Sequence, residues 1–130
     1  MTFSAGIAAF AKKAGLGLED AATRSLLQLT NNVVIQTPKD QGRAQGNWFP
    51  SVGTPAQGFD LDKTDLVSQS SINSAISDSI GGTYWLVNNL PYIRRLEYDG
   101  HSLQAPNGWV RTNIENFNLM LQDAAQSVKK

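Results

Sequence analysis

Apolar residues recur at helical spacing near both ends of the chain, which predicts two long amphipathic helices. The stripe of the first helix consists of Leu18, Ala22, Leu26, Leu29 and Val33. The stripe of the last helix consists of Ile114, Phe117, Leu121, Ala124 and Val128. Pro38 is expected to end the first helix, because the residue before a proline disfavours helical geometry. A tight turn is expected next, in which Gly42 can take a positive φ and Asp40 accepts backbone hydrogen bonds. Thr112 and Glu115 have the spacing of a capping box, which places the start of the last helix there.

Two further helices are predicted between these long ones. The first runs from about Asp65 to Ile80, with Asp62 or Thr64 as its N-terminal cap. The isoleucines that share one of its faces are Ile72, Ile76 and Ile80. The second is short, because Pro91 suits a first helical position and Asp99-Gly100 provides a C-terminal stop.

Three short strands are also predicted. The clearest runs from Thr83 to Asn88 and is rich in aromatic and β-branched residues. Its two faces, formed by Tyr84 and Leu86 and by Thr83, Trp85 and Val87, are both largely apolar. We therefore expect helices of this chain, or another subunit, to cover both faces. The run 47–52 is predicted as a second strand, at an edge because of Pro50, and Trp109-Val110-Arg111 as a third.

Together these elements predict an α+β fold, in which a small antiparallel β-sheet is packed by N-terminal and C-terminal helices with an additional middle helix. The length of 130 residues fits a single domain, which we assign to residues 18–130. Residues 1–17 are a candidate flexible N-terminal arm, because Gly15-Leu16-Gly17 weakens a helix. Apolar residues at 3, 7, 10 and 14 have helical spacing, so the pattern leaves open whether residues 3–14 extend the helix or form a separate arm.

Composition excludes several classes of protein. The chain has no cysteine, which excludes a disulfide framework and a thiolate zinc site. Its 11 basic and 11 acidic residues balance, which argues against free nucleic acid as the main partner. No apolar run approaches the roughly 20 residues of a membrane span. The first basic residues follow the apolar part of the N-terminus, the reverse of a secretory signal, so we expect a soluble protein made in the cytoplasm.

The sequence contains no constellation typical of an enzyme, and we expect neither catalytic residues nor a cofactor. His101 is the only histidine, and its spacing to Glu97 and Asp99 matches no metal motif, so we expect no metal site. Arg94 and Arg95 form a small basic spot, which is explained by a solvated helix face partly paired with acidic neighbours. The tryptophans and tyrosines lie in or beside the predicted strands, where they can fill a core or a subunit contact.

Three segments of the chain, at residues 37–48, 88–98 and 102–111, read TPKDQGRAQGNW, NNLPYIRRLEY and SLQAPNGWVR. They resemble segments of a known family, the putative tail components or neck and tail-completion proteins of long-tailed double-stranded DNA phages. Residues 37–48, TPKDQGRAQGNW, are similar to the family's TP-x-D-T-G-R-x-x-x-x-W segment. Residues 88–98, NNLPYIRRLEY, resemble its NNLPYA-x-x-LEYG, and residues 102–111, SLQAPNGWVR, resemble its S-x-QAP-x-GMVR. The departures are Gln41 in place of Thr, Asp99 inserted before the Gly, and Trp109 in place of Met. The segments occur in the family's order, and with the terminal helices the resemblance covers nearly the whole chain.

The resemblance implies a structural virion protein of the phage neck, without catalytic role or cofactor. The motif residues that it singles out are Pro38, Asp40, Gly42, Arg43, Trp48, Asn89, Pro91, Tyr92, Glu97, Tyr98, Pro106 and Gly108. The implied protein forms a homo-oligomeric ring at the head–tail junction, preferably of six copies with twelve as the alternative. Its implied partners are neighbouring neck proteins and the tail terminator or tail tube, and DNA passes through the channel without specific recognition. No membrane is involved.

The candidate ring interface consists of Trp85, Val87, Arg94, Arg95 and Arg111, together with the N-terminal arm. Two other classes of function stay open from the residues alone. One is a small ligand-binding or enzymatic domain that uses the region of Tyr92, Arg94, Tyr98 and His101. The other is a small nucleic-acid-binding module that uses Arg43, Arg94, Arg95 and Arg111.

Overall fold

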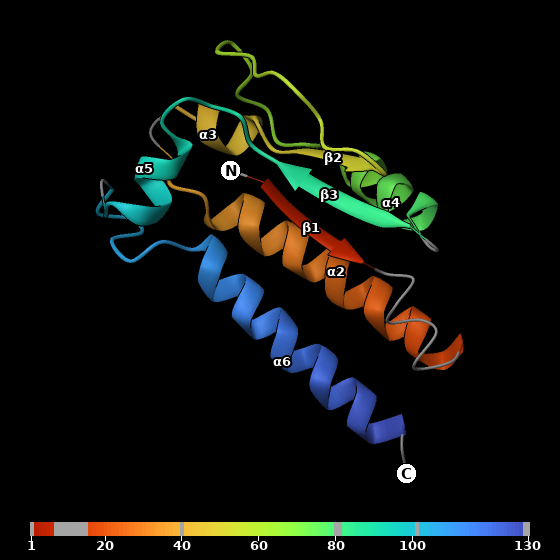
Figure 1. Ribbon diagram of the computed structural model, residues 1–130. Coiled ribbons are helices and arrows are strands. Elements are labelled where there is room, and N and C mark those ends of the chain that lie inside the picture. Colours follow the sequence, from red (N-terminus) through yellow and green to blue (C-terminus); the bar gives the residue numbers. More distant parts are fainter. Residues whose placement is uncertain (1, 7–15, 40, 80–81, 101, 129–130) are drawn as a thin grey trace.

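The computed structural model describes residues 2–6, 16–39, 41–79, 82–100 and 102–128, with the backbone alone for residues 2–6, 16–22 and 120–128. The fold is α+β, as predicted: a small antiparallel sheet with helices packed against it (Figure 1). The elements are β1 (Thr2–Gly6), α2 (Leu16–Gln36), α3 (Arg43–Gly46), β2 (Phe49–Val52), α4 (Gln69–Asp78), β3 (Thr83–Val87), α5 (Ile93–Tyr98) and α6 (Val110–Val128). No helix in the described part of the chain is long and apolar enough to cross a membrane.

The sheet has the strand order β1-β3-β2, and both pairings are antiparallel. β3 is the central strand, and its residues Tyr84 and Leu86 are completely buried against the helices. β2 lies at an edge, which agrees with Pro50, because a proline cannot donate to a ladder on both sides. The sheet is therefore organised around β3, as the apolar pattern of that strand indicated.

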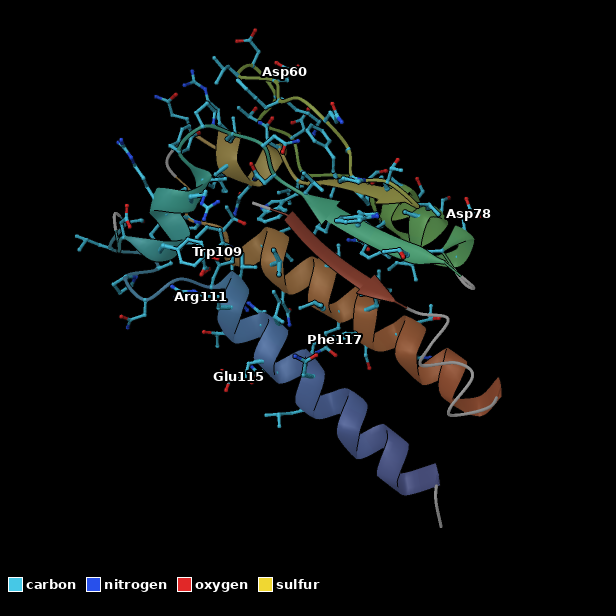
Figure 2. All side chains as sticks on the ribbon, viewed as in Figure 1. Asp60, Asp78, Trp109, Arg111, Glu115 and Phe117 are labelled. Atoms are coloured by element: carbon cyan, nitrogen blue, oxygen red, sulfur yellow. The ribbon has the colours of Figure 1, made fainter. Side chains whose placement is uncertain are left out.

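The helices form the remaining layers of the fold. α2 lies between the sheet and α6, and it packs against both α6 and α4 (Figure 1). The stripes predicted for these helices meet in one core, which includes Leu26 and Leu29 from α2, Ile72 and Ile76 from α4, and Phe117 from α6. Figure 2 shows Phe117 between α6 and α2, with Glu115 on the opposite side of α6. The side chains of Leu18, Ala22 and Leu121, and Ile80 as a whole, lie outside the described residues.

Tyr84 connects the sheet to α2 through a polar contact inside this core. Its hydroxyl lies 3.0 Å from the hydroxyl of Thr30, which itself donates to the carbonyl of Leu26 at 2.9 Å. Burial raises the pKa of Tyr84 to about 12, and the hydrogen bond with Thr30 opposes part of that rise. Tyr84 is therefore a neutral core residue with a satisfied hydroxyl.

The predicted third strand, at residues 109–111, is wrong. Helix α6 begins at Val110, two residues before the expected capping box of Thr112 and Glu115. The reason is a distant carboxylate: Glu97 of α5 accepts hydrogen bonds from the backbone N–H groups of Trp109 and Val110. These N–H groups have no partner within the helix, so Glu97 supplies the cap from outside it.

The predicted middle helix is present, but it begins later in the chain than predicted. α4 begins at Gln69, and Ser68 is its cap, with its hydroxyl accepting from the backbone N–H of Ser71 at 3.2 Å. The residues offered as caps, Asp62 and Thr64, belong instead to the loop of residues 53–68. Asn47 holds this loop, because its side chain donates to the carbonyl of Asp60 and accepts from the backbone N–H of Asp60.

The N-terminal segment differs from the pattern of apolar residues. Residues 2–6 form strand β1 and pair with β3 in the register from Thr2–Val87 to Gly6–Thr83. The helical spacing that begins at Phe3 therefore does not describe residues 2–6, because pairing with the edge of β3 overrides it. The rest of the candidate arm up to Gly15 lies outside the described residues.

Candidate functional site

The segments of residues 37–48, 88–98 and 102–111 meet around one cleft, which has a volume of about 450 Å³. The first segment contributes Pro38, Gln41, Gly42, Arg43 and Ala44 to its wall. The second contributes Tyr92 and Leu96, and the third contributes Ser102 and Gln104. Residues up to 66 positions apart in the sequence thus share one surface, which makes this cleft the candidate functional site.

Gly42 shapes the first wall of the cleft. Its φ of +88° lies in the left-handed region, as the sequence predicted, and the short helix α3 starts immediately after it. A Cβ at this position would lie 3.2 Å from the carbonyl oxygen of Thr64, and one at Gly46 would lie 2.5 Å from that of Lys63. The two glycines let the loop before α4 lie close against α3. Asp40, the other predicted residue of this turn, lies outside the described residues.

Side-chain amides connect the walls of the cleft to one another. Asn88, buried at the end of β3, donates to the carbonyl of Ala44 at 2.8 Å and accepts from the backbone N–H of Leu90 at 3.2 Å. Gln104 pairs with the backbone of Lys39 twice, accepting from its N–H and donating to its carbonyl, both at 2.8 Å. These hydrogen bonds therefore hold three parts of the cleft in a defined arrangement: α3, residues 88–90 before α5, and the loop of residues 102–108.

Glu97 is the most constrained charged group beside the cleft. Its side chain is fully buried, and it accepts from the N–H of Trp109 at 2.7 Å and from Arg111 Nε at 3.0 Å. Arg111 also donates from its terminal nitrogen to the carbonyl of Glu97 at 2.8 Å. Gly108 permits this contact, because its φ is +84° and a Cβ there would collide with the carboxylate. A buried carboxylate requires such partners, so Glu97 is structural.

An exposed cluster of Arg94, Tyr98 and Arg111 lies on the other side of α5. The guanidinium carbons of Arg111 and Arg94 lie 4.5 Å and 5.7 Å from the centre of the Tyr98 ring, which is half exposed. Both distances are typical of cation–π contacts. The acidic partner expected for Arg94 and Arg95 was Glu97 or Asp99, but Glu97 pairs with Arg111 instead. Figure 2 shows Trp109 and Arg111 at the start of α6, next to α5.

The other predicted motif residues support the frame around the cleft. Trp48 is fully buried, and its indole donates to the hydroxyl of Thr37 at 2.8 Å. Asn89 donates to the carbonyls of residues 56 and 58 in the long loop, at 3.1 Å and 3.2 Å. Pro91 is exposed just before α5, and Pro106 is exposed in the loop before α6. His101 lies outside the described residues.

Trp85 and Val87, the two candidate interface residues on β3, differ in their exposure to solvent. Val87 is 1% exposed, so it cannot contribute contact area to another subunit without rearrangement. Trp85 is partly exposed, and its indole donates to the carbonyl of Gly53 at 2.9 Å. Of the remaining candidates, Arg94, Arg95 and Arg111 are exposed on α5 and at the start of α6.

Sequence reasoning missed the polar residues that organise this region. They are Thr37, Gln45, Asn47, Asn88 and Gln104. Gln45, for example, donates to the carbonyls of Ile35 and Thr37 at the end of α2, which would otherwise lack partners. The one available signal was Asn88, an amide directly after an apolar strand, since a buried amide needs dedicated partners.

The chemistry of the cleft is suited to recognition. Among the described residues of its wall, the cationic group is Arg43, and it lies with the amides of Gln41 and Gln104, the hydroxyl of Ser102 and the ring of Tyr92. Within the described part of the chain, no group of three or more histidine, cysteine or acidic side chains could hold a metal ion. Amide donors, a guanidinium and an aromatic ring are groups that bind the backbone or carboxylates of a protein partner.

In comparisons with protein-family models, curated proteins and solved structures, nothing matched this chain.

Proposed function

We propose that this protein is a structural subunit of the phage neck, a head–tail connector or tail-completion protein that forms a ring around the DNA channel. The observation that carries the proposal is the convergence of three segments on one cleft. These segments resemble phage tail components, and residues 49–87 separate the first segment from the other two. A surface assembled from all three is the expected place for the contact that such proteins share.

The cleft has features that suit a contact between subunits. Leu103 lies between two residues of its wall, and its side chain is 97% exposed. An isolated exposed leucine is ordinary, but here it stands beside an open hollow with hydrogen-bonding groups. A neighbour that covers Leu103 would bury apolar area and could pair its backbone with Gln41 or Ser102.

The proposed assembly is a homo-oligomeric ring, with six copies preferred and twelve as the alternative. Its neighbours in the virion are other neck proteins and the tail terminator or tail tube. DNA passes through the channel without specific recognition, which fits a chain whose 11 basic and 11 acidic residues balance. The protein is made in the host cytoplasm and is incorporated at the top of the tail.

The described geometry does not favour the other two classes of function. Of the residues in the ligand-binding or enzymatic alternative, Tyr92 lines the cleft, whereas Arg94 and Tyr98 pack against each other on another face of α5. Of the arginines in the nucleic-acid alternative, Arg111 is committed to Glu97 and Arg43 faces the cleft.

The test combines composition of the virion with a matched pair of surface variants. Mass spectrometry of purified virions and a reconstruction of their necks should find the chain there as a ring. Leu103→Asp should strongly reduce incorporation, whereas Leu119→Asp, at a leucine that is 54% exposed on α6, should leave it near the wild-type level. Virions without this chain would refute the structural role. Equal incorporation of both variants would remove the cleft from the contact.

A further inference from the structure

Strand β1 is attached to the domain differently from the other strand at the sheet edge. β2 packs along β3 and also against helix α4. Among the described elements, the backbone of β1 lies closest to β3, with which all five of its residues are in register. The backbone of β1 is therefore held by a ladder with a single strand.

β3 is paired along both of its edges. β2 covers four residues of β3, and β1 covers five along the opposite edge. The residues of β1, Thr-Phe-Ser-Ala-Gly, include two with low strand propensity, Ala5 and Gly6, so their extended form depends in part on the edge that receives them. An edge of this kind accepts an equivalent strand from any copy of the chain, because main-chain hydrogen bonds supply the affinity.

The chain between β1 and α2 is long enough to reach a neighbouring subunit. Nine residues, 7–15, separate Gly6 from Leu16. Fully extended, nine residues span about 30 Å, which is comparable to the diameter of a small domain. The strand can therefore be supplied within one chain or from the next chain in an assembly.

We propose that β1 is exchanged between copies: in the assembled ring, Thr2–Gly6 of one subunit pairs with β3 of the next in the same antiparallel register. This inference rests on the proposed ring. Each subunit gives one strand and receives one, so the exchange is head-to-tail and can close. Both arrangements contain the same ladder, so the exchange adds a subunit contact at no loss of strand pairing.

Cross-strand disulfides distinguish the two arrangements, because the natural chain has no cysteine. The carbonyl of Thr83 accepts from Gly53 on the β2 side, so Gly6 and Thr83 form a pair without mutual hydrogen bonds on the β1 side. The Cα atoms of such pairs lie about 4.5 Å apart, within the range that a disulfide bridges. The test variant therefore combines Gly6→Cys with Thr83→Cys. Ser4→Cys with Thr83→Cys, two residues out of register, is the matched control.

The variants are oxidised in assemblies whose mass is measured in parallel, either purified rings or virions that carry the variant. With exchange, the in-register variant should run on a non-reducing gel as a ladder that ends at the full ring, with most of the chain in covalent multimers. The control should remain largely monomeric. Co-assembly of separate Gly6→Cys and Thr83→Cys chains should yield the mixed disulfide dimer.

Two negative results have separate meanings. Assemblies of confirmed mass in which the in-register variant forms its disulfide only within each chain would overturn the exchange and leave the ring intact. A monomeric mass together with absence of the chain from virions would overturn the ring, and the exchange with it.

Discussion

The first backbone N–H groups of helices α4 and α6 have no partner within their helices, and the two helices supply acceptors for them in different ways. α4 uses Ser68, the residue directly before it, whose exposed hydroxyl accepts from a backbone N–H three residues later. α6 uses Glu97, thirteen positions before Val110, whose buried carboxylate accepts from two backbone N–H groups and from Arg111. The first cap is local and hydrated, so its loss exposes a group to water. The second joins two helices in the interior, so its loss leaves buried donors without a partner.

The largest effect is expected for Glu97→Ala. It removes the acceptor for the N–H groups of Trp109 and Val110 and for Arg111, and the first two are buried. Each buried donor left without a partner costs about 1–3 kcal/mol in the free energy of unfolding, and Glu97→Ala leaves both without one. Urea denaturation monitored by tryptophan fluorescence would measure it. A loss below about 1 kcal/mol would mean that water replaces the carboxylate, and the contrast with Ser68 would disappear.

Gly108→Ala tests how closely the Glu97 carboxylate is packed against the start of α6, because a Cβ at this position would contact it. Gly53→Ala is its control, because both glycines have positive φ, of +84° and +81°, but only Gly108 lies against another group. The left-handed conformation alone costs an alanine about 1–2 kcal/mol. Gly108→Ala should cost more than Gly53→Ala, because it also displaces Glu97. Equal changes in melting temperature would show that the carboxylate shifts freely.

A smaller loss is expected for the local cap. Ser68→Ala should lower the free energy of unfolding by about 1 kcal/mol, the usual cost of losing an N-terminal cap hydroxyl. Ser68→Asp should retain stability, because a carboxylate can accept the same hydrogen bond. Thermal unfolding of the two variants in parallel is sufficient. If Ser68→Ala costs as much as Glu97→Ala, the distinction between a local and an interior cap is wrong.

The smallest effect is expected for Arg111→Ala. The arginine side chain is 52% exposed, so water can replace much of its contact with Glu97, and the carboxylate keeps its two backbone donors. The loss should be below about 1 kcal/mol, as for other solvent-screened ion pairs. Chemical denaturation at low and high salt would measure it. A loss that matches Glu97→Ala would show that the ion pair, rather than the helix cap, holds the carboxylate.

The sequence predicted those features whose causes lie within a few residues. The apolar stripes of α2, α4 and α6 required only the helical period, and the buried members Leu26, Ile72 and Phe117 lie in the core. Gly42 required only a turn, and it has the expected positive φ. The α+β class follows from these elements, because an apolar strand and amphipathic helices must cover one another.

The candidate site was predictable only in part. The three segments could be named from the sequence, but nothing in their order indicated that Gly42, Tyr92 and Gln104 line the same cleft. The amide pairs that hold its walls, such as Gln104 with Lys39, join residues 65 positions apart. No local pattern encodes a pairing of that kind, because an amide side chain can bond to any exposed backbone group.

Taken alone, the sequence determined which stretches are amphipathic, where the chain turns and which chemistry is absent from its composition, since each depends on residue type and short-range geometry. The tertiary structure decided that residues 2–6 form a strand and that α6 begins at Val110. Both outcomes depend on a partner far along the chain: the edge of β3 for the N-terminal segment, and the carboxylate of Glu97 for the helix. A hydrogen-bonding group can be satisfied by any partner that the fold brings close, and only the folded chain shows which one does so.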